Sequence, residues 1–179
     1  MSTLLKESIN INVETLKRIE EVDLADLCNI SEQAIKAGGG FGWLSIPPRT
    51  VLKKYWKGVV LIDYKKLIVG RLNGAIAGTL QLTLQPRNNE AQKNTAHIQS
   101  HFVAPWARGY GLAKSMIDYT EKISKESGIK CLQLDIRETQ GAAIQLFKSK
   151  GFTQWGENPY YAFINSKFIK GLYFYKNIW

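Results

Sequence analysis

Several features that mark common protein classes are scarce or missing in this chain. Its two cysteines, Cys28 and Cys131, are far apart and form neither a disulfide framework nor a metal-ligand spacing. No run approaches the roughly 18 apolar residues of a membrane helix, and the N-terminus lacks the apolar core of a signal peptide. We therefore expect a cytoplasmic protein in a reducing compartment, with no metal site and no membrane partner.

Two familiar phosphate-binding loops are also missing. There is no G-x-x-x-x-G-K-[ST] loop, and no G-x-G-x-x-G opens an N-terminal strand–turn–helix unit. Internal repeats and low-complexity tracts are absent as well. What the chain does have is 179 residues, 45% of them hydrophobic, which is enough for one sizeable core. A single domain spanning residues 1–179 is the expected organisation.

Acidic residues are outnumbered, and the formal net charge is +9. The main basic cluster contains Arg49, Lys53, Lys54, Lys57, Lys65 and Lys66. These residues fall on the polar face of one expected helix and the turn after it, which is typical of a solvated basic face. A polyanionic cofactor would account for part of the remaining charge. Nucleic acid is not the expected partner, although the charge keeps an RNA-binding module open as an alternative.

Hydrophobic periodicity predicts a mixed α/β (α+β) protein of about seven strands and four helices. The expected order is β-α-α-β-β-β-α-β-α-β-β. The strands are expected at 8–13, 66–72, 75–85, 96–103, 131–136, 152–161 and 170–176, and the helices at 22–36, 47–56, 111–127 and 141–150. Asn73-Gly74 is a type I′ hairpin signal between two of the strands. The strand at 96–103, its helix and the strand at 131–136 form a right-handed parallel crossover, flanked by antiparallel hairpins.

Two glycine-containing loops are candidates for ligand contact. Residues 103–113 join a strand to a helix and place Arg108, Gly109 and Gly111 at the helix N-terminus, where unpaired amides can bind a phosphate. The alternative is an ordinary strand-to-helix turn. The triple glycine at 38–40, followed by Phe41-Gly42-Trp43, is suited to lie over a substrate pocket or is a plain connector.

The order of elements, with Arg108-Gly109-Tyr110-Gly111-Leu112-Ala113 after the fourth strand, resembles the GNAT superfamily of N-acetyltransferases. A second segment, Gln140 to Phe152, matches the family form N-x-x-A-[IV]-x-L-Y-x-x-x-G-F, with Gln140 in place of Asn and Phe147 in place of Tyr. The resemblance runs from about Ser8 to Ile178. Within the superfamily the chain is most similar to the tabtoxin-resistance-type acetyltransferases, through segments 96–99, 132–135, 155–162 and 172–176. Such relatives acetylate a primary amine on a small amino-acid-like molecule.

The resemblance implies acetyl-CoA as the cofactor. Its pyrophosphate would be held by Arg108, Gly109, Tyr110, Gly111, Leu112 and Ala113. The pantetheine arm would pair with the strand end at Phe102, Val103 and Ala104, and Gln140 would hydrogen-bond it. The backbone N–H of Val103 would be the oxyanion donor.

Three residues are candidates for catalysis. His97 is the expected base, because imidazole titrates near neutral pH and the chain has only two histidines. His101 shares its strand face if no bulge intervenes, and would lie nearer the thioester. Asp135 would hold the substrate ammonium or help to pass its proton to water. The alternatives are histidines satisfied by strand neighbours, and an Asp135 paired structurally with Arg137 or a lysine.

Phe147 stands where many relatives place a tyrosine as the general acid. Either the thiolate leaves unassisted, or Tyr110, Tyr160 or Tyr161 substitutes, or the chain binds acetyl-CoA with impaired catalysis. The resemblance thus predicts an N-acetyltransferase (a transferase of the acyltransferase class) that acts on a small amine by direct attack in a ternary complex. Acetylation of a protein N-terminus or lysine, a non-catalytic acetyl-CoA- or RNA-binding module, and a homodimer all stay open.

Overall fold

The computed structural model describes residues 9–39 and 41–179 and contains one seven-stranded mixed sheet. Along the sheet the strands follow the order β1-β2-β3-β4-β5-β7-β6. Their bounds are β1 Ile11–Leu16, β2 Lys65–Leu72, β3 Ala75–Leu84, β4 Thr95–Val103, β5 Cys131–Arg137, β6 Thr153–Ile164 and β7 Lys167–Asn177. Four α-helices accompany them: α1 Glu21–Lys36, α2 Arg49–Val59, α3 Leu112–Glu126 and α4 Gly141–Ser149. Two short 3₁₀ helices, η1 Glu90–Gln92 and η2 Pro105–Ala107, lie before and after β4.

The predicted order of strands and helices is confirmed, and the differences lie at element ends. The first strand runs over Ile11–Leu16 rather than 8–13, and Ser8 lies outside the described residues. The closing hairpin is longer than predicted, because β6 and β7 approach to a turn at Asn165 and Ser166, both with positive φ. Among the helices of the described residues, none has the length and apolarity needed to cross a membrane.

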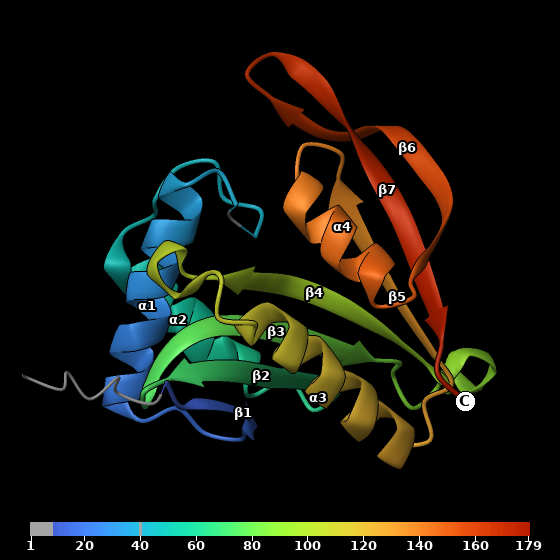
Figure 1. Cartoon of the computed structure of the whole chain (residues 1–179), viewed down its shortest axis with the longest axis horizontal. Coiled ribbons are helices and arrows are strands. Elements are labelled where there is room, and N and C mark those ends of the chain that lie inside the picture. The colour runs from blue at the N-terminus through green and yellow to red at the C-terminus, as the bar shows by residue number, and fades with distance from the viewer. Residues whose placement is uncertain (1–8, 40) are drawn as a thin grey trace, which may run out of the picture.

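The helices cover the sheet on both faces (Figure 1). Helices α1 and α2 pack on one face of β2, β3 and β4, and α3 packs on the other. The core between them is large and apolar, and it includes the fully buried Leu24, Leu27, Leu52, Trp56 and Leu80. Helix α3 sits close to the strands because Gly70 and Gly78 leave room for it: a Cβ on either would come within 3.0 Å of the Met116 side chain. These contacts place the N-terminal turn of α3 beside the end of β4.

The sheet opens between its fourth and fifth strands. Parallel pairing of β4 with β5 covers only Thr95–Ile98 against Cys131–Leu134. Beyond these residues the two strands diverge, and β7 pairs with the other edge of β5. Helix α4 and the projecting β6–β7 hairpin lie on the far side of the opening in Figure 1. Backbone groups on the facing edges of both strands are thereby left without a neighbouring strand.

A bulge in β4 changes which way its side chains point. The pairs Thr79–Phe102 and Gln81–Gln99 leave two residues of β4, Ser100 and His101, opposite one residue of β3. Ser100 has φ 49°, a left-handed conformation that is uncommon outside glycine. The expectation that His97 and His101 share a face required an unbroken strand, so the bulge overturns it. Each histidine instead has its own surroundings.

Candidate active site

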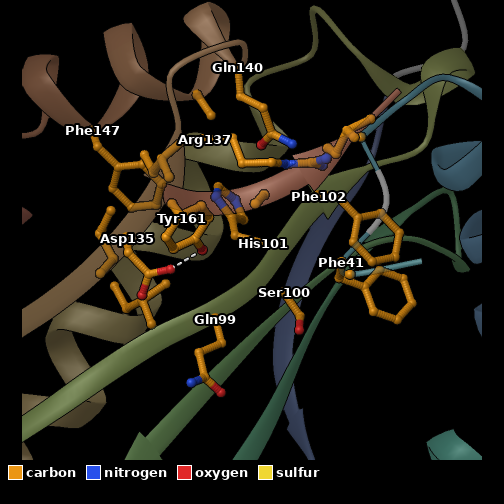
Figure 2. Close-up of a pocket in the computed structure, with 18 of the residues that line it drawn as sticks. Phe41, Gln99, Ser100, His101, Phe102, Asp135, Arg137, Gln140, Phe147 and Tyr161 are labelled. Atoms are coloured by element: carbon orange, nitrogen blue, oxygen red, sulfur yellow. Dashed lines mark hydrogen bonds between the residues drawn. The ribbon is translucent and has the colours of Figure 1, made fainter. Parts of the chain in front are cut away.

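A cavity of about 530 Å³ lies at the opening between β4 and β5. Five segments line it: part of the α1–α2 loop, residues 98–102 of β4, residues 134–137 of β5, the start of α4, and residues 161–164 of β6. Figure 2 shows Asp135, Tyr161 and Phe147 on one side of it and the stacked rings of Phe41 and Phe102 on the other. The volume falls in the range of about 300–1,000 Å³ that small-molecule sites occupy.

Asp135 is the central polar group of this cavity. Its Oδ1 lies 2.8 Å from His97 Nε2, and its Oδ2 accepts a hydrogen bond from the Tyr161 hydroxyl. The carboxylate and Tyr161 line the cavity, whereas His97 stands behind Asp135 on the neighbouring strand and is 27% exposed. The three side chains thus form a chain from the cavity wall through Asp135 to a partly exposed imidazole.

The electrostatics of this cluster keep a negative charge at the cavity wall. The hydrogen bond with His97 lowers the pKa of Asp135, against the opposing effect of burial. Burial and the neighbouring carboxylate raise the pKa of the Tyr161 phenol, so Tyr161 remains a neutral donor. Near neutral pH the cluster therefore presents an ionised carboxylate, which suits an ammonium or amine ligand.

Tyr161 reaches Asp135 because of two irregularities in the closing hairpin. The pairing of β6 with β7 shifts between Asn158 and Ala162, which turns Tyr161 toward the cavity. Its ring then lies directly on the backbone of Gly171 in β7, where an added Cβ would stand 2.2 Å from the Tyr161 ring. Only glycine at 171 allows the ring to lie there.

The loop at the end of β4 turns sharply into α3. Gly109 and Gly111 have φ 85° and 82°, and no atom lies within 4 Å of a Cβ built on either one. Gly111 is the N-cap of α3, so the first amides of this 15-residue helix point out over the loop. This loop does not line the cavity itself, but it follows directly from the strand that does.

Comparison with known proteins identifies the family. The model of the acetyltransferase (GNAT) family matches residues 34–152. An uncharacterized N-acetyltransferase from the hisH–hisA intergenic region of Azospirillum brasilense is 47% identical over 131 residues, which cover 73% of this chain and 78% of that protein. The chain belongs to the GNAT family. It is an acetyl-CoA-dependent N-acetyltransferase.

Solved structures of low sequence identity share the GNAT fold. An N-acetyltransferase from Staphylococcus aureus superposes with a TM-score of 0.78 at 18% identity, over 95% of this chain and 99% of that one. A Salmonella typhimurium protein solved with its cofactor acetyl-CoA superposes with a TM-score of 0.75 at 15% identity, over 94% of each chain. At these identities the likeness concerns the fold alone.

The residues present fit the GNAT cofactor acetyl-CoA. The side-chain-free cradle at Gly109 and Gly111 and the helix N-terminus above it suit a pyrophosphate. The opening beside β4 suits an extended arm, since the amide of Ala104 bonds Ala77 of β3 and strand alternation directs the Val103 amide to the opposite edge. When bound, acetyl-CoA supplies the activated acetyl group.

The structure gathers most, but not all, of the residues named from the sequence. Asp135, His101, Phe102, Gln140 and Phe147 line the cavity together, while residues 103–104 and 108–113 lie beyond its lining. Asp135 hydrogen-bonds His97 and Tyr161, and the alternative partner Arg137 donates from its Nη2 to the carbonyl of Gly38 at 3.4 Å. Phe41, which stacks on Phe102, and Gly39, Gly42 and Leu44 line the cavity, so the α1–α2 loop borders the site; Gly40 lies outside the described residues.

The sequence patterns did not predict the hydrogen bond between Tyr161 and Asp135. Tyr161 was named only as one of three tyrosines that could replace the general acid, because its position beside Asp135 depends on a bulge and a glycine contact far along the chain. Of the other tyrosines named as substitutes for the acid, Tyr160 and Tyr110 are 71% and 45% exposed. No periodicity of the strand distinguishes Tyr161 from Tyr160.

Proposed function

We propose that this chain transfers the acetyl group of acetyl-CoA to the primary amine of a small amino-acid-like molecule, as the tabtoxin-resistance-type acetyltransferases do. The observation that carries the proposal is the ionised Asp135, held by His97 and Tyr161 at the wall of the cavity between β4 and β5. Arg137 adds a positive charge to the same cavity. A carboxylate and a guanidinium together complement the ammonium and carboxylate of an amino acid.

The residues of the cluster have different roles toward the amine. Asp135 binds and orients the ammonium, with the Tyr161 hydroxyl fixing the carboxylate. The proton that the amine loses passes through Asp135 to His97, whose partly exposed ring gives it to water. The amine then attacks directly, because neither cysteine is placed to carry the acetyl group: Cys28 is buried in α1 and Cys131 opens β5 away from the cavity lining.

The cofactor residues keep the roles expected from the sequence. Residues 108–113 would hold the pyrophosphate, with Arg108 adding a charge-assisted contact. Residues 102–104 and Gln140 would hold the pantetheine arm, and the Val103 amide would meet the acetyl oxygen. One acetyltransferase domain over residues 1–179 is consistent with structural neighbours that cover 94–95% of the chain.

An acceptor screen tests the proposal. Release of free CoA is measured from acetyl-CoA with amino acids, the matching amino acid amides, simple amines and short peptides. Amino acids are expected to be the best acceptors, and R137Q is expected to raise the KM for an amino acid far more than the KM for its amide. Preference for peptides would favour protein acetylation, and acetyl-CoA binding with no turnover on any amine would favour the non-catalytic module.

A further inference from the structure

The cavity between β4 and β5 has two large apolar side chains that are open to solvent. Leu44 comes from the α1–α2 loop and Phe163 from β6, and both line the cavity although they are 64% and 59% exposed. In Figure 1 the loop and the β6–β7 hairpin flank the opening from either side. A single exposed leucine is ordinary, but two such residues from distant segments at one cavity are a more specific observation. They offer an apolar surface that a ligand can cover.

Strand β6 relates this apolar surface to the carboxylate of the cavity. Tyr161 and Phe163 are two residues apart in β6, the spacing at which side chains share a face of a strand, and both line the cavity. Tyr161 donates its hydroxyl to Asp135. At ~3.3 Å per residue, the backbone positions of Tyr161 and Phe163 are about 7 Å apart. An apolar group at Phe163 can thus belong to the same small molecule as an ammonium at Asp135.

Phe163 is held in place by its own hairpin. Its ring packs on Phe168, the residue opposite it in β7, with ring centroids 5.0 Å apart. Phe168 in turn meets the ring of Tyr160 edge-on, also at 5.0 Å. A side chain that is already packed loses little conformational freedom when a ligand contacts it. The hairpin side of the apolar surface is therefore formed before the ligand arrives.

We propose that Leu44 and Phe163 bind the side chain of the acceptor, so that the acceptors are amino acids with an apolar side chain, such as leucine. The inference rests on the proposed function, in which Asp135 holds the acceptor ammonium and Arg137 its carboxylate. The apolar pair adds the third contact that an amino acid needs to be fixed by all of its groups. Contact of the side chain with both residues removes apolar surface of the ligand and of the protein from water, which favours binding.

Leucine and asparagine test the inference, because their side chains share one branched shape and differ in polarity. Acetylation of leucine is expected to have a kcat/KM at least about 10-fold above that of asparagine, since only leucine gains from burial against an apolar surface. L44A is expected to reduce this ratio about 3–10-fold, mainly through a higher KM for leucine. The matched control L61A removes the same side chain at a position that is 79% exposed and outside the cavity lining, so it should keep the ratio.

Binding without turnover separates the inference from the proposed function. With CoA present in place of acetyl-CoA, calorimetry measures the Kd for each amino acid. The unaltered protein is expected to bind leucine more tightly than asparagine, and F163A is expected to lose most of that preference. Equal affinity for the two amino acids, or a ratio unchanged in both L44A and F163A, overturns the inference even if amino acids are acetylated. If leucine is preferred through Leu44 and Phe163 and yet is not acetylated, the inference stands and the proposed function fails.

Discussion

The hydrogen bonds around Asp135 suit a single carboxylate to the amine-binding role that we propose for it. His97 and Tyr161 each take one carboxylate oxygen, so the group has a fixed orientation as well as a charge. The cost of partial burial is offset by these two bonds, and the net effect is a lowered pKa. Asp135 therefore stays negatively charged throughout the neutral range, as the proposed binding of an ammonium requires, and the partly exposed His97 is the proposed route for a proton to water.

Removing the Tyr161 hydroxyl should impair the reaction without disturbing the fold. In Y161F the carboxylate loses a hydrogen bond of the kind worth about 1.5–3 kcal/mol, so kcat/KM for the amine should fall about 10–100-fold. Steady-state kinetics measure the change. The control is Y160F, the same substitution one residue earlier, where the ring is 71% exposed and packs on Phe168. Equal losses in both variants would contradict the role of Tyr161.

His101 should make stability depend on pH in a defined window. Its pKa is about 4 in the folded chain and 6.5 in an unfolded one, so between these values only the unfolded state binds the proton. Unfolding is then favoured as pH falls from 6.5 toward 4, at up to about 1.4 kcal/mol per pH unit. Denaturant unfolding at several pH values should show a shallower decline for H101L than for the unaltered protein. Parallel curves for the two would mean that His101 becomes protonated inside the fold.

Among the elements, the β6–β7 hairpin decides where Tyr161 lies. G171A should displace the ring, because an added Cβ would stand 2.2 Å from it and the contact is with the rigid start of the side chain. We expect a loss of amine turnover similar to that of Y161F, with a lower Tm. G156A in the same hairpin is the matched control, since a Cβ there meets nothing within 4 Å. Full activity of G171A would show that Tyr161 does not need its present position.

The glycines at the two ends of α3 provide a matched pair of variants for testing the cofactor loop, because alanine would be under similar backbone strain at both positions. Gly111 before the helix and Gly128 after it have φ 82° and 75°, and a Cβ on either meets no atom within 4 Å. Alanine at either position should therefore cost a similar amount of stability, about 1–2 kcal/mol. Only G111A places a methyl group in the pyrophosphate cradle, so only G111A should raise the Kd for CoA. Calorimetry with CoA compares the two variants, and an equal Kd for both would place the pyrophosphate elsewhere.

Local sequence patterns predicted the elements well and the contacts between them poorly. The Asn73-Gly74 hairpin and the helix starts depend on neighbouring residues, and both were predicted to within a few positions. The Ser100 bulge was not, because it follows from the pairing of β4 with a distant strand. The same holds for the bond between Tyr161 and Asp135, which joins strands that are not adjacent in the sheet. The motif residues could thus be named, but their neighbours could not.

At the scale of the whole molecule, the sheet is built as two parts that meet at the β4–β5 opening. On one side lie β1 to β4 with three helices, and on the other β5 to β7 with α4 (Figure 1). Each part contributes one wall of the cavity, β4 with the α1–α2 loop on one side and β5 with α4 and β6 on the other. Since parallel pairing holds the two parts together over only four residue pairs, the rest of that edge is available to a ligand.

The net charge of +9 adds a long-range attraction for a polyanionic cofactor. Salt screens such an attraction, since the Debye length falls from about 10 Å at 0.1 M to about 3 Å at 1 M. Raising NaCl across this range should raise the KM for acetyl-CoA several-fold. S-acetylpantetheine carries the same acetyl thioester without phosphates, so its KM should stay nearly constant. This donor is the control that distinguishes the screening of charge from any effect of salt on the fold. If the two donors respond alike, the charge of the molecule plays no part in cofactor binding.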